Sequence, residues 1–468
     1  MDSSKALSIV ESWESELESH RAALVAAASA GGASVDAPVC DEVILSDKSY
    51  TAEAARIIAD FMNRPGPGGA PSVASGVTRL DASDMIASRM EDEGLEVLTT
   101  LCDAFRRSGL REVNLSDNAM GSKGVSACRS VLGRQRGTLE CLRLCNNGLS
   151  SESMGEVADI LTGDAKDEYE NDDKDNDNST TICSRLRIIH FYNNMSGDGG
   201  CRAFARILSG CTSALTDIRF SGTRAGREGS LLVASALDSL GESVRNLTKL
   251  DLADNSFGPE GGRLLFRSLS RCRNLSHLDL RDCVLEDGGL KQICHALWSA
   301  DLPVVHLDVS GNEITAKGAG ALGDFVKEAV SLRVLCAEEN EMTSRGIAAL
   351  ARSLGRGGGK GLVKVQLGCN ECGTIGARAL LEAYRGAEGM PNLKKIDLDG
   401  NGFTEEDVDH LQAAFGERLG EMEDNDDEAE FDDDLESDEE VEDDKGRDGN
   451  ADADMNALAE AMADSGLV

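Results

Sequence analysis

The stretch that decides the fold is LREVNLSDN at residues 110–118, because its pattern returns at residues 393–401 as LKKIDLDGN. Apolar side chains stand at offsets 0, 3 and 5 of each stretch, and an asparagine stands at offset 8. Two weaker copies begin at Cys40 and Val77, and the same template fits stretches that begin at Leu139, Leu186, Leu215, Leu247, Leu275, Val304, Leu332 and Leu362. The chain therefore contains about twelve copies of one structural unit.

The length of the repeat predicts what each copy forms. Seven repeats separate Asn194 from Asn401, so one repeat is about 30 residues long. That length has room for a short strand, a turn and a full helix. A single repeat cannot bury its apolar side chains alone, so neighbouring repeats must stack. We therefore predict an α/β fold, a leucine-rich-repeat solenoid with long, ribonuclease-inhibitor-like repeats, a concave parallel sheet and convex helices.

The residue at offset 8 predicts how the turn after each strand is held. It is asparagine in every strong copy except two, where Thr223 and Cys283 take its place. An asparagine side chain both donates and accepts hydrogen bonds, so it can satisfy backbone groups of the turn that an apolar residue would leave unpaired. We expect Asn147 and the equivalent asparagines to be buried and structural.

The limits of the repeats divide the chain into three parts. We predict an N-terminal helical cap or extension at residues 1–38, the repeat domain at 39–420 and an acidic, largely disordered tail at 421–468. Between residues 421 and 444 the tail has 17 Asp or Glu residues and no Lys or Arg, and such a segment cannot offset its ordering entropy. Residues 163–184 lengthen one repeat by about 17 residues, and their acidic composition predicts a disordered loop.

The charge and composition exclude some classes of partner and site. With 84 acidic and 47 basic residues the net charge is −37, which disfavours nucleic acid, because that partner needs a basic face. A partner with a basic patch would be steered towards this chain.

The sequence has no run of 18 apolar residues and does not open on a secretory segment, so we expect no membrane insertion. Many of the 14 cysteines stand at apolar repeat positions, so we expect reduced thiols in a cytoplasmic protein. We also expect a monomer.

Three short motifs resemble metal or nucleotide sites and fail on spacing. Asp397-Leu-Asp-Gly opens like a calcium-binding EF-hand loop, but Val408 stands where that loop needs a bidentate Glu. Cys369-x-x-Cys372 has no second pair, and the glycines at 355–361 lack the Ser or Thr and the element order of a phosphate-binding loop. We therefore expect no metal, no cofactor and no self-contained active site, so the chain would not itself be an enzyme.

Offset 4 of each strand points to the concave face, and its charges are segregated along the chain. The early repeats place basic or neutral residues there, Arg143 and His190 among them, and the later repeats mostly acidic ones. For any single charge, a solvated surface is the simpler interpretation. The segregation predicts a bipolar partner surface or two contact zones, with the partner-binding residues Asp251, Asp279 and Asp308 in the acidic part.

Four stretches resemble one family of regulatory proteins. They are DMIASR at 84–89, VNLSDNAMG at 113–121, LRLCNNGL at 142–149 and FYNNMSGDGG at 191–200. In this order they resemble the Ran GTPase-activating proteins, in particular the plant form, and the resemblance covers roughly residues 40–445. The sequence departs from that form because it has no Trp-Pro-Pro motif, and Ser88 stands where the family usually has Gly before the arginine.

The resemblance implies that the chain binds Ran in its GTP form, with a Ran-binding protein as a further partner, and stimulates GTP hydrolysis in nucleocytoplasmic transport. It implies a cytoplasmic location, with the nuclear envelope as a second one. The family is thought to act through a rim asparagine that holds the catalytic glutamine of Ran in place, without an arginine finger. The pair Asn146 and Asn147 occupies the matching position.

The repeat template separates the roles of these two asparagines. Asn147 is the turn residue at offset 8, whereas the template demands no particular residue at Asn146. We assign the catalytic positioning role implied by the resemblance to Asn146. Arg89 matches the functionally important arginine of the family, either as a contact or as support for the rim. Asp117 and Asn193 hold the position equivalent to Asn146 in the neighbouring repeats and are predicted to bind the partner.

Two other classes of protein stay open. A non-enzymatic binding protein of ribonuclease-inhibitor type shares the long repeats, but it gives no reason for the order of Arg89, residues 116–118 and the pair at 146–147. An acidic-tailed, histone-binding nuclear protein would share the tail, but its repeats are shorter and lack full helices.

Overall fold

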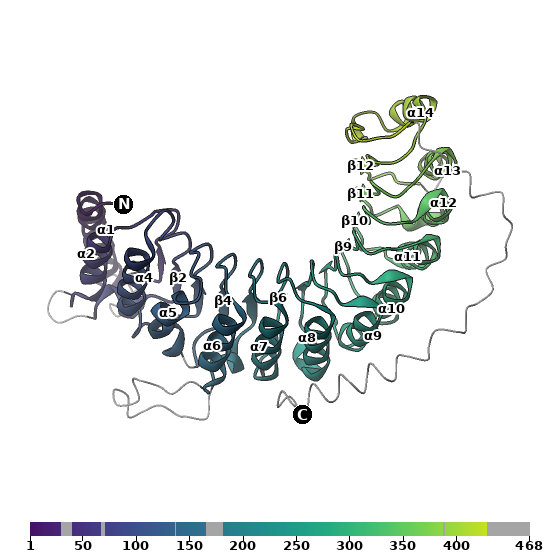
Figure 1. Ribbon diagram of the computed structural model, residues 1–468. Coiled ribbons are helices and arrows are strands. Elements are labelled where there is room, and N and C mark those ends of the chain that lie inside the picture. Colours follow the sequence, from purple (N-terminus) through teal and green to yellow (C-terminus); the bar gives the residue numbers. More distant parts are fainter. Residues whose placement is uncertain (30–39, 67–70, 136, 165–180, 387–388, 428–468) are drawn as a thin grey trace. The chain divides into compact units, whose positions relative to one another are not determined.

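A computed structural model describes residues 1–29, 40–66, 71–135, 137–164, 181–386 and 389–427 (Figure 1). The chain forms two compact units, Met1–Ser213 and Ala214–Val468, each of which is described by itself. In both units, short parallel strands stand in chain order and a helix follows each strand. Both units are therefore built as a leucine-rich-repeat solenoid, and the predicted fold class is confirmed.

The first unit holds five strands among its described residues, and each pairs in parallel with the next. The strands are β1 Glu42–Ile44, β2 Arg79–Asp81, β3 Glu112–Asn114, β4 Cys141–Arg143 and β5 Ile188–His190. Equivalent offsets of successive repeats are in register, so Val113 lies opposite Leu80 on one side and Leu142 on the other. The helices and helical turns of this unit are α1 Ser3–Ser29, α2 Ala52–Asn63, α3 Val73–Gly76, α4 Glu91–Ala104, α5 Gly124–Gly133, α6 Ser151–Thr162, η2 Cys183–Arg185 and α7 Gly197–Ser209.

The second unit holds seven strands in its described part, again paired in parallel in chain order. They are β6 Asp217–Arg219, β7 Lys249–Asp251, β8 His277–Asp279, β9 His306–Asp308, β10 Val334–Cys336, β11 Lys364–Gln366 and β12 Lys395–Asp397. Within this unit the strands line the inner side of the curve and the helices its outer side (Figure 1). The helices and helical turns are α8 Arg227–Ser239, η3 Gly241–Val244, α9 Gly258–Leu269, α10 Glu286–Ser299, α11 Ala316–Glu328, α12 Thr343–Ser353, η4 Leu354–Gly358, α13 Thr374–Arg385, α14 Glu405–Phe415 and η5 Gly416–Arg418.

The middle residue of each strand belongs to the core. Val113, Leu142 and Ile189 are each fully buried, as are most of the apolar residues at offsets 0 and 5. Burying a side chain of this size stabilises the folded chain by about 1.5–3 kcal/mol. Because successive strand residues point to opposite faces, offsets 2 and 4 face away from the helices. The repeat therefore fixes which side chains can meet a partner.

Asparagine side chains at offset 8 connect each repeat to its neighbours, and we call this row the asparagine ladder. Asn147 is fully buried, and its Nδ2 donates to the Leu115 carbonyl (3.0 Å). Its Oδ1 accepts from the backbone N–H of Asn118 (2.8 Å), and its own N–H donates to Oδ1 of Asn194 (3.1 Å). The structural role predicted for the offset-8 asparagines is confirmed.

The two exceptions to asparagine at offset 8 keep the ladder connected in another way. Thr223 donates its hydroxyl to Oδ1 of Asn255 (2.6 Å). Cys283 donates its thiol to the Leu252 carbonyl (3.4 Å), and its backbone N–H donates to Oδ1 of Asn312 (3.1 Å). A small side chain with one donor is therefore sufficient where the next repeat supplies the acceptor.

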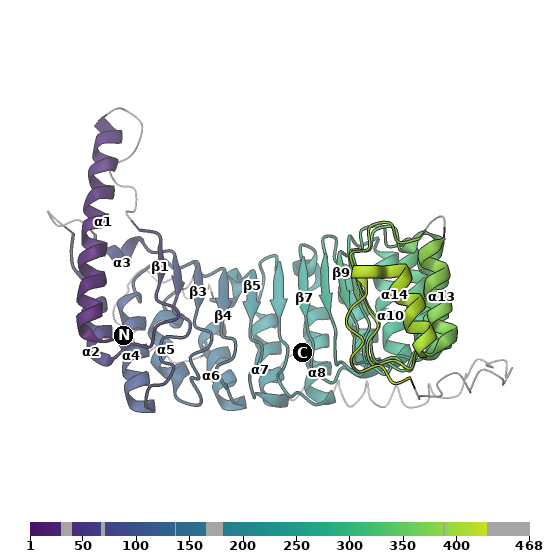
Figure 2. The same ribbon diagram turned by 90° about the horizontal axis from the view of Figure 1, so that it is seen from above.

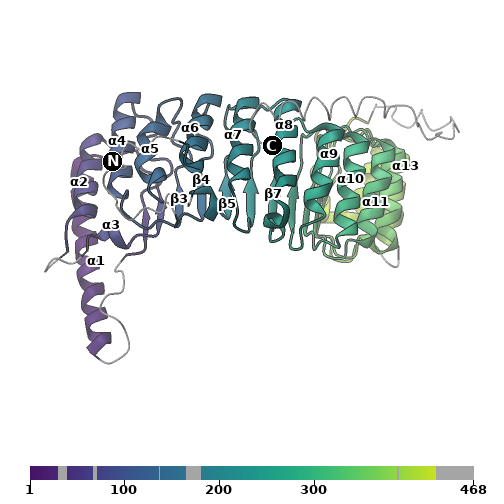
Figure 3. The ribbon, with the colours of Figure 1, turned by 90° about the horizontal axis from the view of Figure 1, so that it is seen from below.

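Helix α1 packs against the first repeat of the first unit. Ala6 is buried, and the ring centroids of Trp13 and of Phe61 on α2 lie 5.9 Å apart. Arg64, directly after α2, forms an ion pair with Glu14 (2.6 Å). Figures 2 and 3 show the far part of α1 extending beyond the repeats of this unit. Although α1 is 27 residues long, neither it nor any other described helix combines the length and apolarity needed to cross a membrane.

Residues 420–427 close the last repeat of the second unit. Asn425 accepts from the backbone N–H of Phe403 (3.1 Å) and donates to the Phe403 carbonyl (2.9 Å). The backbone N–H of Asp426 donates to the Asn401 carbonyl (2.8 Å). Hydrogen-bonded structure therefore continues to Asp426, beyond the boundary expected at residue 421. The rest of the predicted tail, and residues 165–180 of the predicted acidic loop, lie outside the described residues.

Candidate protein-binding site

The residue just before each ladder asparagine lies at the tip of a turn, on the rim of the first unit. Asp117, Asn146 and Asn193 hold this position in three successive repeats, and all three are exposed. Their backbone is left-handed, with φ of 61°, 51° and 54°. Asn, Asp and Gly adopt this conformation most readily, because other side chains clash with the backbone there. Glu339 and Cys369 hold the equivalent position of other repeats with φ of 53° and 51°, so the template demands no particular residue there, although the left-handed turn favours Asn, Asp and Gly.

The side chains of these three residues form a hydrogen-bonded chain, which we call the amide row. Nδ2 of Asn193 donates to Oδ1 of Asn146 (2.9 Å), and Nδ2 of Asn146 donates to Oδ1 of Asp117 (2.8 Å). The backbone below is held as well, since the N–H of Asn146 donates to the Tyr192 carbonyl (2.9 Å). The amide of Asn146 is thus exposed and fixed in orientation by a neighbour on each side.

Arg89 lies on the same rim, one repeat before Asp117, and is tied to the first repeat. Its Nε donates to Oγ of Ser49 (2.9 Å), and its terminal nitrogen donates to the Ser49 carbonyl (3.0 Å). A third contact reaches Glu93 at 3.7 Å, and the side chain is only 24% exposed. The preceding Ser88 has a φ of 64°, which accounts for a glycine at this position in the resembling family. These contacts favour support of the rim over direct reach to a partner.

Exposed methionines flank the amide row and Arg89. Met195 follows Asn193 by two residues and is 57% exposed, and Met90 follows Arg89 directly and is 81% exposed. Methionine is enriched at protein–protein interfaces, because its flexible, polarisable side chain adapts to a partner surface. The rim of the first unit therefore combines fixed polar groups with accessible apolar area.

In the second unit, Asp251, Asp279 and Asp308 lie side by side on β7, β8 and β9, and we call them the acidic strip. Each also has a local structural role, because its Oδ1 accepts a hydrogen bond from the backbone N–H two residues later, at 3.2 Å, 3.1 Å and 3.1 Å. Arg219 on β6 pairs with Asp251 at 2.5 Å. Burial and the neighbouring charges of Asp251 and Asp308 raise the pKa of Asp279 to about 6.

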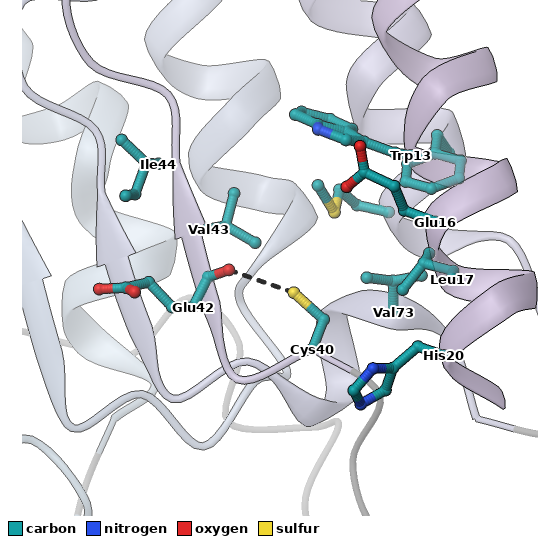
Figure 4. Close-up of a pocket in the computed structure, with 11 residues that line it drawn as sticks. Trp13, Glu16, Leu17, His20, Cys40, Glu42, Val43, Ile44 and Val73 are labelled. Carbon is teal, nitrogen blue, oxygen red and sulfur yellow. Dashed lines mark hydrogen bonds between the residues drawn. The ribbon is translucent and has the colours of Figure 1, made fainter. Parts of the chain in front are cut away.

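A hollow of about 390 Å³ lies between α1 and the edge strand β1 of the first unit (Figure 4). Its walls are mostly apolar, with Trp13, Leu17 and Val73 among the side chains that line it. The Cys40 thiol there donates to the Glu42 carbonyl (3.1 Å), and burial raises the pKa of that thiol. A protonated, hydrogen-bonded thiol is a poor nucleophile, so the hollow does not point to catalysis.

The motifs dismissed on spacing have structural roles in the second unit. Asp399 accepts hydrogen bonds from the backbone N–H groups of Gly400 (2.9 Å) and Asp424 (2.8 Å). The backbone N–H of Cys372 donates to the ladder residue Asn401 (3.1 Å). One cluster of possible metal ligands is not visible as a sequence motif. The donor atoms of His306, Asp308 and Cys336 lie within 4.8 Å of one another. The signal in the sequence was His-x-Asp in one strand followed by Cys at offset 4 of the next.

Comparison with known proteins agrees with the fold. The model of the family described as "Leucine Rich repeat" matches residues 110–127, 245–266, 271–294 and 303–323. The chain is 33% identical over 149 residues to RAN GTPase-activating protein 2 of Arabidopsis thaliana, which covers 31% of this chain and 27% of that protein. It is 27% identical over 344 residues to the ribonuclease inhibitor of Sus scrofa, which covers 71% of this chain and 67% of the inhibitor.

The chain is also similar to a longer protein whose name includes such repeats. It is 27% identical over 286 residues to NACHT, LRR and PYD domains-containing protein 5 of Bos taurus, which covers 59% of this chain and 23% of that protein. The similarity therefore spans about a quarter of the length of the plant GTPase-activating protein and of this bovine protein. Relatives of these kinds share the repeat and differ in what they do, so function has to be argued from the site.

Proposed function

We propose that the chain is an activator of the GTPase Ran, which binds GTP-loaded Ran and stimulates GTP hydrolysis by orienting the partner's catalytic glutamine. The observation that carries the proposal is the amide row, an exposed and fixed side-chain network in the repeats that resemble Ran GTPase-activating proteins. In this proposal the nucleotide and its magnesium belong to the partner. The proposed setting is nucleocytoplasmic transport, in the cytoplasm and at the nuclear envelope, with the chain acting as a monomer and a Ran-binding protein as a further partner.

The proposed chemistry depends on the remaining hydrogen-bonding capacity of Asn146. A primary amide has two N–H donors and an oxygen with two acceptor sites. Asp117 takes one donor and Asn193 takes one acceptor site, which fixes the amide plane. The remaining donor and acceptor match those of a glutamine side chain, which is also a primary amide. Fixing that glutamine would hold the attacking water in line with the γ-phosphate, and positioning of this kind accelerates phosphoryl transfer.

Other surfaces have supporting roles in the proposal. Arg89 acts as a positioning residue, because its contacts with Ser49 hold the rim beside the amide row. Met195 contributes apolar contact area to the complex. The net charge of −37, with the acidic strip as one part of it, steers a partner that has a basic surface and raises the association rate at low salt.

The second candidate is a binding protein that occludes its target without stimulating a reaction. The similarity to the pig ribonuclease inhibitor favours it, since that similarity covers 71% of this chain. Such a protein would use the same concave strands and rim, and it would bind Ran, a ribonuclease or another target with no effect on the rate of GTP hydrolysis. Binding alone therefore does not separate the two candidates, whereas a rate does.

The test is single-turnover hydrolysis of GTP on Ran with the wild-type chain and with Asn146→Gly. Glycine is the right replacement, because Gly222, Gly311 and Gly400 hold the same left-handed position in other repeats. We expect the maximal stimulated rate to fall on the order of 10²-fold, as after the loss of one preorganised transition-state group. The affinity for GTP-loaded Ran should fall much less, because one rim residue is a small part of an interface.

The matched control is Asp254→Gly, which also places glycine at this offset but in the second unit, where φ is 54°. It should leave the rate unchanged. Full activity in Asn146→Gly would remove the role assigned to that residue. If the wild-type chain left the hydrolysis rate of Ran unchanged, the activator proposal would be lost and the binding candidate would stand.

A further inference from the structure

The cluster missed by linear motifs lies on the concave face of β9 and β10 in the second unit. His306 and Asp308 are two residues apart on β9, so their side chains leave the same face of the strand. Cys336 on β10 is in direct register with Asp308. Their ligand atoms, one imidazole nitrogen, one carboxylate oxygen and one sulfur, all lie within 4.8 Å of one another. Two consecutive repeats thus bring three different donor groups close together.

We propose that His306, Asp308 and Cys336 form a binding site for a divalent transition metal, with zinc as the ion that the donor set fits best. Imidazole, thiolate and carboxylate are the three protein ligands of zinc, and zinc sites with three protein ligands keep a fourth, open position. Calcium and magnesium take oxygen ligands only, so a sulfur donor excludes them. The fourth position would face the concave surface, open to water or to a donor from a partner.

Neighbouring side chains restrain two of the three ligands. The ring of His277 stacks on His306 at a centroid distance of 5.9 Å and an interplanar angle of 19°, which restrains the imidazole plane. The Cys336 thiol is 4% exposed and donates to Oε1 of Gln366 (3.1 Å). On binding, the thiol proton leaves to solvent and the sulfur–metal bond takes its place, with no change of oxidation state.

The electrostatics of the neighbouring strands also favour a cation. Asp308 is the last carboxylate of the acidic strip, and its charge contributes to the raised pKa of Asp279. Arg281 also faces these carboxylates, and their charges raise its pKa. On the other side, the Lys364 ammonium donates to the Gln366 side chain. A divalent ion at Asp308 would therefore offset the mutual repulsion along the strip.

The test uses the full chain, stripped of metal and kept reduced, and titrates it with Co²⁺ and with Zn²⁺. We expect one equivalent of Co²⁺ to give a near-ultraviolet thiolate-to-cobalt absorption band, which one equivalent of Zn²⁺ abolishes. Cys336→Ser and His306→Gln should each weaken zinc affinity by about 10²-fold or more, since even second-shell changes cost 10–100-fold. Excess Mg²⁺ or Ca²⁺ should not displace the cobalt.

The matched control is Cys369→Ser, which removes an exposed thiol from the same unit and leaves the cluster intact. It should bind cobalt with an unchanged band, as should a chain truncated after Asp427, which lacks most of the acidic residues of the tail. The proposal is overturned if no thiolate band appears, or if the band survives in Cys336→Ser. It is also overturned if tight zinc binding is lost in Cys369→Ser or in the truncated chain.

Discussion

Asn146 and Asn147 are chemically identical neighbours with opposite surroundings. Asn147 is fully buried, and its amide bonds backbone groups of the preceding repeat. Asn146 is exposed, and its amide bonds only the side chains of Asp117 and Asn193. One row therefore holds the repeats together, whereas the other presents a fixed polar surface. The side chain alone does not determine the role of an asparagine here; the backbone conformation and the burial of each position do.

The largest effect on stability should come from Asn147→Ala. The change leaves the Asn118 N–H without its partner in the core, and it removes one of the two amide donors to the Leu115 carbonyl. We expect a loss of about 1–3 kcal/mol in the free energy of unfolding, measured by urea denaturation. The stimulated rate per folded molecule should stay near that of the wild type. A large loss of that rate at unchanged stability would show that the asparagine ladder, like the amide row, takes part in function.

Asn425→Ala should have the next largest effect. It removes both contacts with Phe403 from a site that is only partly buried, so we expect a loss of about 1 kcal/mol. Truncation after Leu419 should cost more than truncation after Asp427, because only the first cut removes residues 420–427. Equal thermal midpoints for the two truncated chains would show that residues 420–427 do not stabilise the last repeat.

The third effect separates two replacements at Asn146. Alanine resists the left-handed conformation, so Asn146→Ala should be about 1 kcal/mol less stable than Asn146→Gly. The stimulated rate should be low in both. The comparison is made by chemical denaturation together with single-turnover rates, and alanine and glycine variants of equal stability would mean that the turn relaxes at this position.

The smallest effect concerns the pH dependence contributed by the acidic strip. The pKa of Asp279 rises from 3.8 to about 6 on folding, so the folded chain favours the protonated form. The stability that this contributes is full below pH 3.8 and is lost as pH rises through about 6. Asp279→Asn keeps the acceptor for the Arg281 N–H and removes the charge. The variant should gain on the order of 1 kcal/mol or less over the wild type above pH 6, because solvent screens the partly exposed group.

The gain of Asp279→Asn should shrink as pH falls towards 5, and urea unfolding at several pH values measures it. A gain that stays constant with pH would mean that packing around position 279, and not the carboxylate charge, is responsible. The measurement also bears on the proposed metal, since a zinc ion bound at Asp308 should reduce the pH dependence in the wild type.

The sequence predicted the fold because a period of about 30 residues leaves few ways to bury the apolar offsets. It predicted the buried role of Asn147 for the same reason, since the template repeats that position nearly everywhere. It did not predict the left-handed turn at Asn146, because no pattern of apolar residues reports φ. Sequence spacing also concealed two other features. His306 and Cys336 meet only through the register of two strands, and Asn425 bonds Phe403 from a segment outside the repeat.

The asparagine ladder has a consequence for how such a chain changes length. The backbone of each turn is bonded by the asparagine of the next repeat, and its own asparagine bonds the turn before it, so most junctions share one connector. Whole copies can be duplicated or deleted between two junctions without new chemistry at either side. The connector after the last strand is of another kind, because Asn425 bonds the turn at Phe403 from outside the repeat. Gene duplication can therefore lengthen the protein from within, while the closing segment stays last.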